Sequence, residues 1–224
     1  MDFVRAQHGY FDGRNRPRWI VIHDMEYPKR VGAARWCANY FAGPNAPPKS
    51  AHYCIDANET VQSVRDQDGA WHTPGFAAGL EVNRNSIGIE HAGYANQSAA
   101  EWADAYSSAE LERSAALTAS LATRLKIPTS RRLTVNEIQS GQPGFAGHVD
   151  FTRATGSGSH TDPGTHFPWD TYLARVRAHQ SGEASQAEAS PLRTIVLATA
   201  AGIGIWALLN PSQAQRAIRR ILPI

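Results

Sequence analysis

Apolar residues lie along this chain both in short unbroken runs and in longer stretches with helical spacing. Residues 19–23 (WIVIH) and 86–90 (SIGIE) are runs rich in β-branched residues, and each ends in a polar side chain. Such runs are typical of strands buried within a sheet. Residues 52–56 and 60–64 flank a polar turn at 57–59 and predict a β-hairpin.

Helical spacing of apolar residues marks three other stretches, at residues 31–41, 107–125 and 169–179. The first runs into a loop rich in proline, which ends the helix. The third begins directly after Pro168, a position where a missing N–H does no harm. We therefore expect three substantial helices.

Three further segments give weaker signals. Residues 133–138 are weakly strand-like, residues 1–17 are polar and turn-rich, and residues 71–85 are expected to form a loop. Taken in order, strands alternate with helices, with one hairpin among them. This order predicts an α/β fold with a mixed central β-sheet flanked by helices.

The composition changes at Gln180. Residues 1–179 are expected to form one domain, and residues 180–193, which are small and polar, a flexible linker. Residues 194–224 are expected to form a hydrophobic C-terminal helix with a basic amphipathic end. Its first part, residues 194–209, is apolar on every face but shorter than the ~20 residues of a comfortable bilayer span. Membrane association is favoured over two alternatives, docking on the domain and self-association.

The overall composition is that of a globular protein. Of 224 residues, 42% are hydrophobic, and the net charge of +2 is too small to predict a nucleic-acid partner. The N-terminus lacks the pattern of a secretory signal, so synthesis in the cytoplasm is expected. Cys37 and Cys54 lie in apolar surroundings and are expected to be buried thiols, while a disulfide between them stays an open alternative.

Three side chains at the ends of elements or in loops suggest a catalytic zinc site. His23 ends the first apolar run, His148 lies in GHVD at 147–150, and Asp162 follows a Gly/Ser-rich loop. Two histidines and one carboxylate are a recurring ligand set for Zn²⁺, with a fourth position left for water. Each residue alone has an ordinary structural explanation, as a core histidine or a turn carboxylate. We expect the edge of a sheet to bring the three together.

Glu90 directly follows a buried run, where a carboxylate needs a partner or a function. Close to a reacting water it could accept the proton, and a salt bridge at the strand end is the alternative. His91 is expected to point to the opposite face of the sheet, because side chains alternate along a strand.

Six short motifs occur in an order and spacing that resemble a known family. They are VIH at 21–23, SAHYCID at 50–56, WH at 71–72, NSIGIE at 85–90, GHVD at 147–150 and TDPG at 161–164. Together they resemble the type-2 N-acetylmuramoyl-L-alanine amidases, which include phage endolysins, cell-wall recycling amidases and peptidoglycan recognition proteins. The resemblance covers roughly residues 17 to 178.

The resemblance implies a zinc amidase that cleaves peptidoglycan between N-acetylmuramic acid and L-alanine. The residues it implies are the zinc ligands His23, His148 and Asp162, the catalytic glutamate Glu90, the oxyanion-stabilising His160, and the groove residues His52 and His72. Trp71, next to His72, is expected to bind substrate as well. A phage-type enzyme that lyses the cell wall is the favoured hypothesis. The alternatives are a module that binds muramyl peptides without cutting them and a membrane-anchored wall-remodelling enzyme of the host.

Overall fold

The computed structural model describes residues 1–182, and residues 1–181 form one compact unit. Its centre is a six-stranded sheet in which only β3 and β4 pair antiparallel, so the sheet is mixed as predicted. In spatial order the strands are β1 (Asp2–Phe3), β4 (Thr60–Gln62), β3 (Tyr53–Ile55), β7 (Ser86–His91), β2 (Trp19–Asp24) and β8 (Gly144–Gly147).

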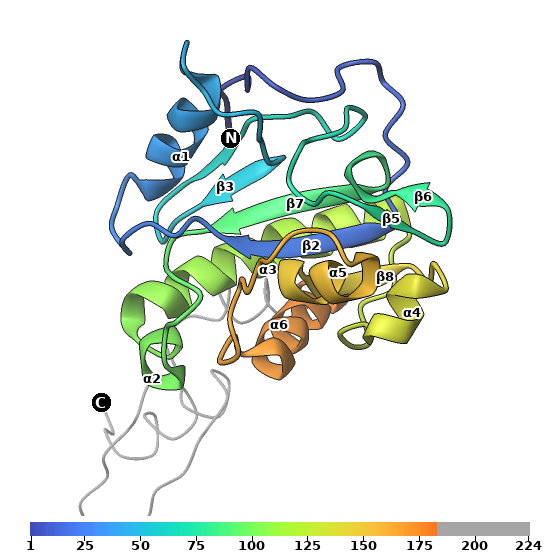
Figure 1. Ribbon diagram of the computed structural model, residues 1–224. Helices are drawn as coiled ribbons and strands as arrows, with labels where there is room; N and C mark the ends of the chain where they lie inside the picture. The colour runs from blue at the N-terminus through green and yellow to red at the C-terminus, as the bar shows by residue number, and fades with distance from the viewer. Residues whose placement is uncertain (183–224) are drawn as a thin grey trace, which may run out of the picture. The chain divides into compact units, whose positions relative to one another are not determined.

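Helices cover both faces of the sheet (Figure 1). On one face α3 (Ala105–Leu125) and α6 (Trp169–Ser181) pack against isoleucines of β2 and β7 such as Ile20 and Ile87. On the other face α1 (Ala33–Ala42) packs over β3, and α5 (His148–Thr155) packs against Trp19 and its neighbours on β2. Burial on both faces explains why β2 is an unbroken apolar run until it reaches His23.

The alternation of side chains along the two central strands decides which residues reach the α1 and α5 face. On β2, Ile20 and Ile22 point toward α3, so His23 points to the opposite face. β2 and β7 are parallel, and His23 lies directly opposite Glu90 in their register. The two polar residues that end the apolar runs therefore lie side by side on the same face of the sheet.

The long elements agree with the sequence pattern, and several short ones do not. Both central strands, the β3–β4 hairpin and the three long helices are present. The prediction of a strand at residues 133–138 was wrong, because Thr134 caps a short helix, α4 (Val135–Gln139), through a capping box with Glu137. The pattern also missed β1, β8, α5, α2 (Ala99–Trp102), the small hairpin of β5 (Phe76–Ala77) and β6 (Leu80–Glu81), and the 3₁₀ turn η1 (Val82–Arg84).

Within residues 1–182 no helix is both long and apolar enough to cross a membrane. The predicted helix at 194–224, including the apolar run 194–209, lies outside the described residues, as does most of the predicted linker. Cys37 and Cys54 are both buried and free, which agrees with the thiol interpretation.

Candidate metal centre

His23, His148 and Asp162 meet at one point on the α1 and α5 face of the sheet. Their donor atoms all lie within 4.8 Å of one another, and all three residues are buried. The Nδ1 atom of His23 is 2.9 Å from one carboxylate oxygen of Asp162, and Nδ1 of His148 is 3.3 Å from the other. Two imidazole nitrogens and a carboxylate thus converge as the sequence predicted.

Each donor comes from a different part of the fold. His23 lies near the carboxyl end of β2, and His148 is the first residue of α5. The backbone carbonyl of Asp162 accepts a hydrogen bond from the N–H of Val149 at 2.9 Å, which holds the loop against the start of α5. Gly147 permits this approach, because a Cβ there would lie 2.6 Å from Cδ of Pro163.

The hydrogen bonds of His23 favour a cation at this point. Its Nδ1 faces Asp162 at 2.9 Å, and its Nε2 faces Nδ1 of His72 at 2.9 Å. Nδ1 of His72 is an acceptor, because Nε2 of His72 donates to the hydroxyl of Ser86, which itself donates to the carbonyl of Val82. A neutral His23 has one ring proton, and it therefore cannot donate to both His72 and Asp162. A second proton is opposed by burial, which lowers the pKa of His23 to about 4. A metal ion between Nδ1 and the carboxylate satisfies both contacts.

The donor set also has the chemistry that zinc requires. Burial alone would raise the pKa of Asp162, but its contacts with His148 and His23 hold that pKa well below the usual range, so the carboxylate is ionised. Nδ1 of both histidines points toward it, and Nε2 of His148 has no hydrogen-bond partner among the described residues. Two nitrogens and one oxygen match a tetrahedral zinc site with one open position. The residues present therefore fit Zn²⁺.

Glu90 and His160 border the three donors. Glu90 is half-buried, and burial followed by the nearby charge of Asp162 raises its pKa well above the ordinary value. The ring of His160 stacks on that of His148, with centroids 3.8 Å apart, and about half of its side chain is exposed. Both groups can therefore reach a molecule that lies over the donors.

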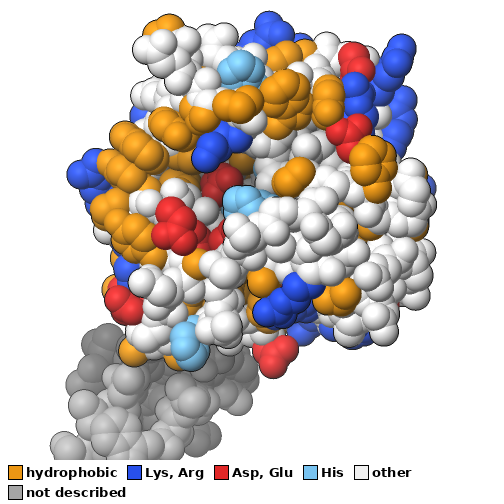
Figure 2. Space-filling model, in the orientation of Figure 1, with side chains coloured by type: hydrophobic (Ala, Val, Ile, Leu, Met, Phe, Trp, Pro, Cys, Tyr) orange, Lys and Arg blue, Asp and Glu red, His pale blue; other side chains and the backbone are white. Residues whose placement is uncertain are grey.

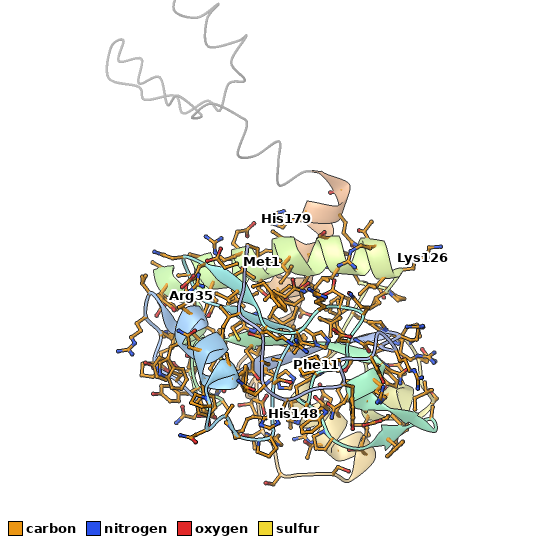
Figure 3. The ribbon with its side chains drawn as sticks, turned by 90° about the horizontal axis from the view of Figure 1, so that it is seen from above. Met1, Phe11, Arg35, Lys126, His148 and His179 are labelled. Carbon is orange, nitrogen blue, oxygen red and sulfur yellow. The ribbon has the colours of Figure 1, made fainter. Side chains whose placement is uncertain are left out.

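A cleft of about 800 Å³ opens over this centre and is lined by Glu90, His160 and the three donors. Figure 2 shows a hollow in this face where acidic and histidine side chains gather between hydrophobic ones. Figure 3, turned by 90°, places His148 on the side of the molecule opposite His179. The cleft is large enough to hold a ligand of drug-like size or larger.

The three residues expected in the groove differ in whether they line the cleft. Trp71 lines the cleft and stacks against His8, with ring centroids 5.7 Å apart. His72 lines its floor but is only 8% exposed. The placement of His52 in the groove was wrong, because it is fully buried: its Nδ1 accepts a hydrogen bond from the N–H of Gly88 and its Nε2 faces a backbone carbonyl.

Sequence reasoning missed Asp24 and two aromatic residues of α1. Asp24 is nearly buried at the cleft wall, and burial, with Asp162 and Glu26 nearby, raises its pKa to about 8. Trp36 and Tyr40 also line the cleft, are substantially exposed, and stack with centroids 5.4 Å apart. Their spacing of four residues on an otherwise polar helix face was the signal that could have identified them.

Known proteins resemble this chain both in sequence and in fold. A family model described as N-acetylmuramoyl-L-alanine amidase matches residues 13–165. None of the curated proteins compared with this chain matches it. Among solved structures, a selenomethionine derivative of AmpD is 28% identical, with a TM-score of 0.54 over 80% of this chain and 93% of that one.

Two other solved structures have a similar fold at lower identity. The hydrolase AmiA of Staphylococcus aureus, in complex with its ligand, is 15% identical, with a TM-score of 0.57 over 83% of this chain and 85% of that one. A mutant endolysin from Bacillus subtilis is 19% identical, with a TM-score of 0.53 over 78% and 97%. At these identities the similarity concerns the fold alone.

Proposed function

Because this chain belongs to the N-acetylmuramoyl-L-alanine amidase family, we propose that it cleaves peptidoglycan between N-acetylmuramic acid and L-alanine, with Zn²⁺ held by His23, His148 and Asp162. The observation that carries the proposal is the convergence of these three buried donors at the floor of a cleft. A bound zinc ion supplies a Lewis acid that activates water near neutral pH and polarises the scissile carbonyl.

Glu90 is proposed to accept a proton from the attacking water and then to pass it to the leaving nitrogen of L-alanine. Its position opposite His23 in the register of β2 and β7 supports this role, because the carboxylate borders the donors without being one of them. Its raised pKa also brings proton transfer closer to neutral pH.

His160 is proposed to donate a hydrogen bond to the carbonyl oxygen as negative charge develops there. Its ring is held flat against His148, and its exposed edge is accessible from the cleft. A donor aimed at the developing charge contributes to catalysis because it is already oriented before the reaction.

Digestion of purified peptidoglycan by the full-length protein tests the proposal. Mass spectrometry is expected to find new free N-terminal L-alanine and lactyl carboxylate ends. Removal of metal by a chelator should stop their release, and added zinc should restore it. His179→Gln, far from the cleft, is the control and should release the same ends at the wild-type rate. Binding of peptidoglycan without new ends would instead establish a binding module.

The proposed site of action is the cell wall, with lysis of the wall as the proposed outcome. Loss of turbidity when the protein is added to a suspension of isolated walls tests this role. Walls that keep their turbidity although the amide ends are released would point to limited remodelling.

A further inference from the structure

Both ring nitrogens of His72 are engaged with neighbouring side chains. Nδ1 of His72 is 2.9 Å from Nε2 of His23, and Nε2 of His72 is 3.0 Å from the hydroxyl oxygen of Ser86. Although His72 lines the cleft, its two ring nitrogens contact the proposed metal ligand His23 and the buried Ser86.

The direction of the hydrogen bonds in this chain of groups follows from its inner end. The hydroxyl oxygen of Ser86 is 2.6 Å from the backbone carbonyl of Val82, and a carbonyl can only accept, so Ser86 donates there. A hydroxyl has one proton, so Ser86 must accept from Nε2–H of His72. With no carboxylate among its described contacts, the buried His72 ring is neutral and its Nδ1 carries a lone pair.

That lone pair determines which ring nitrogen of His23 carries the proton. If Nε2 of His23 also carried a lone pair, two acceptors would face each other at 2.9 Å, so Nε2 of His23 must carry the proton. The hydroxyl of Thr73, 2.9 Å from the same Nδ1 of His72, is consistent with an acceptor at that position. The remaining nitrogen of His23, Nδ1, is then free of a proton and faces Asp162.

We infer that His72 is a positioning residue: the hydrogen-bonded series Val82, Ser86, His72 and His23 keeps the ring proton of His23 on Nε2 and presents Nδ1 to the metal. The inference rests on the proposed zinc function and adds to it a residue that need not touch zinc or substrate. Partners of this kind orient the ligand ring and raise its affinity for the metal.

Gly88, in the middle of β7, provides the space that the ring of His72 occupies. A Cβ on Gly88 would lie 2.6 Å from both Cγ and Nδ1 of His72. Gly88→Ala therefore displaces the ring of His72 without altering any of the three metal donors or Glu90.

Two measurements on the full-length protein test the inference. The first is ¹⁵N NMR of histidine-labelled protein, in which His72 is expected as the Nε2–H tautomer before and after zinc is added. The second is zinc affinity, measured by competition with a chromophoric chelator. His72→Phe and Gly88→Ala are each expected to weaken zinc binding by ~10–100-fold. His72→Asn is expected to recover part of the loss, because its amide oxygen can accept from Nε2–H of His23.

His179→Gln is the matched control, since it removes a histidine on the opposite side of the molecule and should leave zinc affinity unchanged. Far-ultraviolet circular dichroism shows which variants fold, and Ser86→Ala replaces any that does not. His72 found as the Nδ1–H tautomer, or zinc bound by folded His72→Phe as tightly as by wild type, overturns the inference and leaves the proposed function intact. A wild-type protein that binds no zinc overturns the proposed function itself, whatever the tautomer of His72.

Discussion

Glu110, on α3, is a carboxylate with no exposed surface, and its replacement by glutamine is expected to raise the free energy of unfolding at neutral pH. One carboxylate oxygen accepts the backbone N–H of Ala92 at 2.6 Å, and the other has no hydrogen-bond partner among the described residues. Burial raises the pKa of Glu110 well above 4.5; the hydrogen bond from Ala92 and the charge of Lys29 oppose this increase, and Asp56 and Asp104 add to it.

The sign and size of the effect follow from proton linkage. A carboxyl group whose pKa is raised by folding binds its proton more tightly in the folded chain than in the unfolded chain. Stability therefore falls as pH rises above the unfolded-state pKa, near 4.5. For one proton, the decrease in the free energy of unfolding approaches about 1.4 kcal/mol per pH unit until the pH passes the folded-state pKa. Glutamine cannot ionise and keeps an oxygen that can accept the N–H of Ala92.

Urea unfolding of wild type and Glu110→Gln between pH 4 and pH 8, followed by circular dichroism, measures this difference. The two proteins should be similarly stable at pH 4, and the advantage of the variant should widen as the pH rises. Glu112→Gln, which removes a half-exposed carboxylate from the same helix, is the control and should change stability by no more than about 1 kcal/mol at any pH. The reasoning is refuted if the variant is less stable than wild type at pH 8, or if the difference is independent of pH.

Three further predictions concern the site and the helix that carries it. Glu90→Gln is expected to lower kcat by ~10²–10⁴ with zinc affinity unchanged, and near-normal turnover would remove Glu90 from the mechanism. His160→Ala is expected to lower kcat by ~10²–10³, with partial recovery in His160→Lys; equal rates for both variants would argue against an oxyanion donor. Phe151→Ala, at a fully buried ring packed on Trp19, should cost ~3–5 kcal/mol in urea unfolding, and a loss below ~1 kcal/mol would contradict the packing argument.

The sequence alone predicted the elements whose apolar pattern is local and long. β2, β7 and the long helices each carry their own periodicity, and the polar residue that ends each strand run, His23 or Glu90, reaches the candidate centre. β8 could not be predicted in this way. Its sequence is GFAG, and it is a strand because β2 supplies its hydrogen bonds, which no local pattern reports.

The same limit explains the error at His52. This residue directly precedes β3 and carries a family-like motif, but its side chain turns inward and bonds to the backbone of β7. Whether a histidine in such a motif faces a cleft or the interior depends on which strand becomes its neighbour. His72 lies in such a motif and lines the cleft, but the direction of its hydrogen bonds required the positions of Ser86 and Val82.

Two adjacent residues of β7, Glu90 and His91, face opposite sides of this sheet, and His23 is held by His91 on one side and by His72 on the other. Glu90 faces the cleft, whereas His91 faces α3, where its Nε2 is 2.7 Å from the hydroxyl of Ser114. Nδ1 of His91 donates to the backbone carbonyl of His23 at 3.0 Å, because a carbonyl can only accept. The core side of the sheet therefore fixes the backbone of His23, while His72 fixes its ring from the cleft side. A histidine whose backbone and ring are both held loses little further conformational entropy when it binds a metal. A site assembled from distant parts of the chain can therefore still bind a metal tightly.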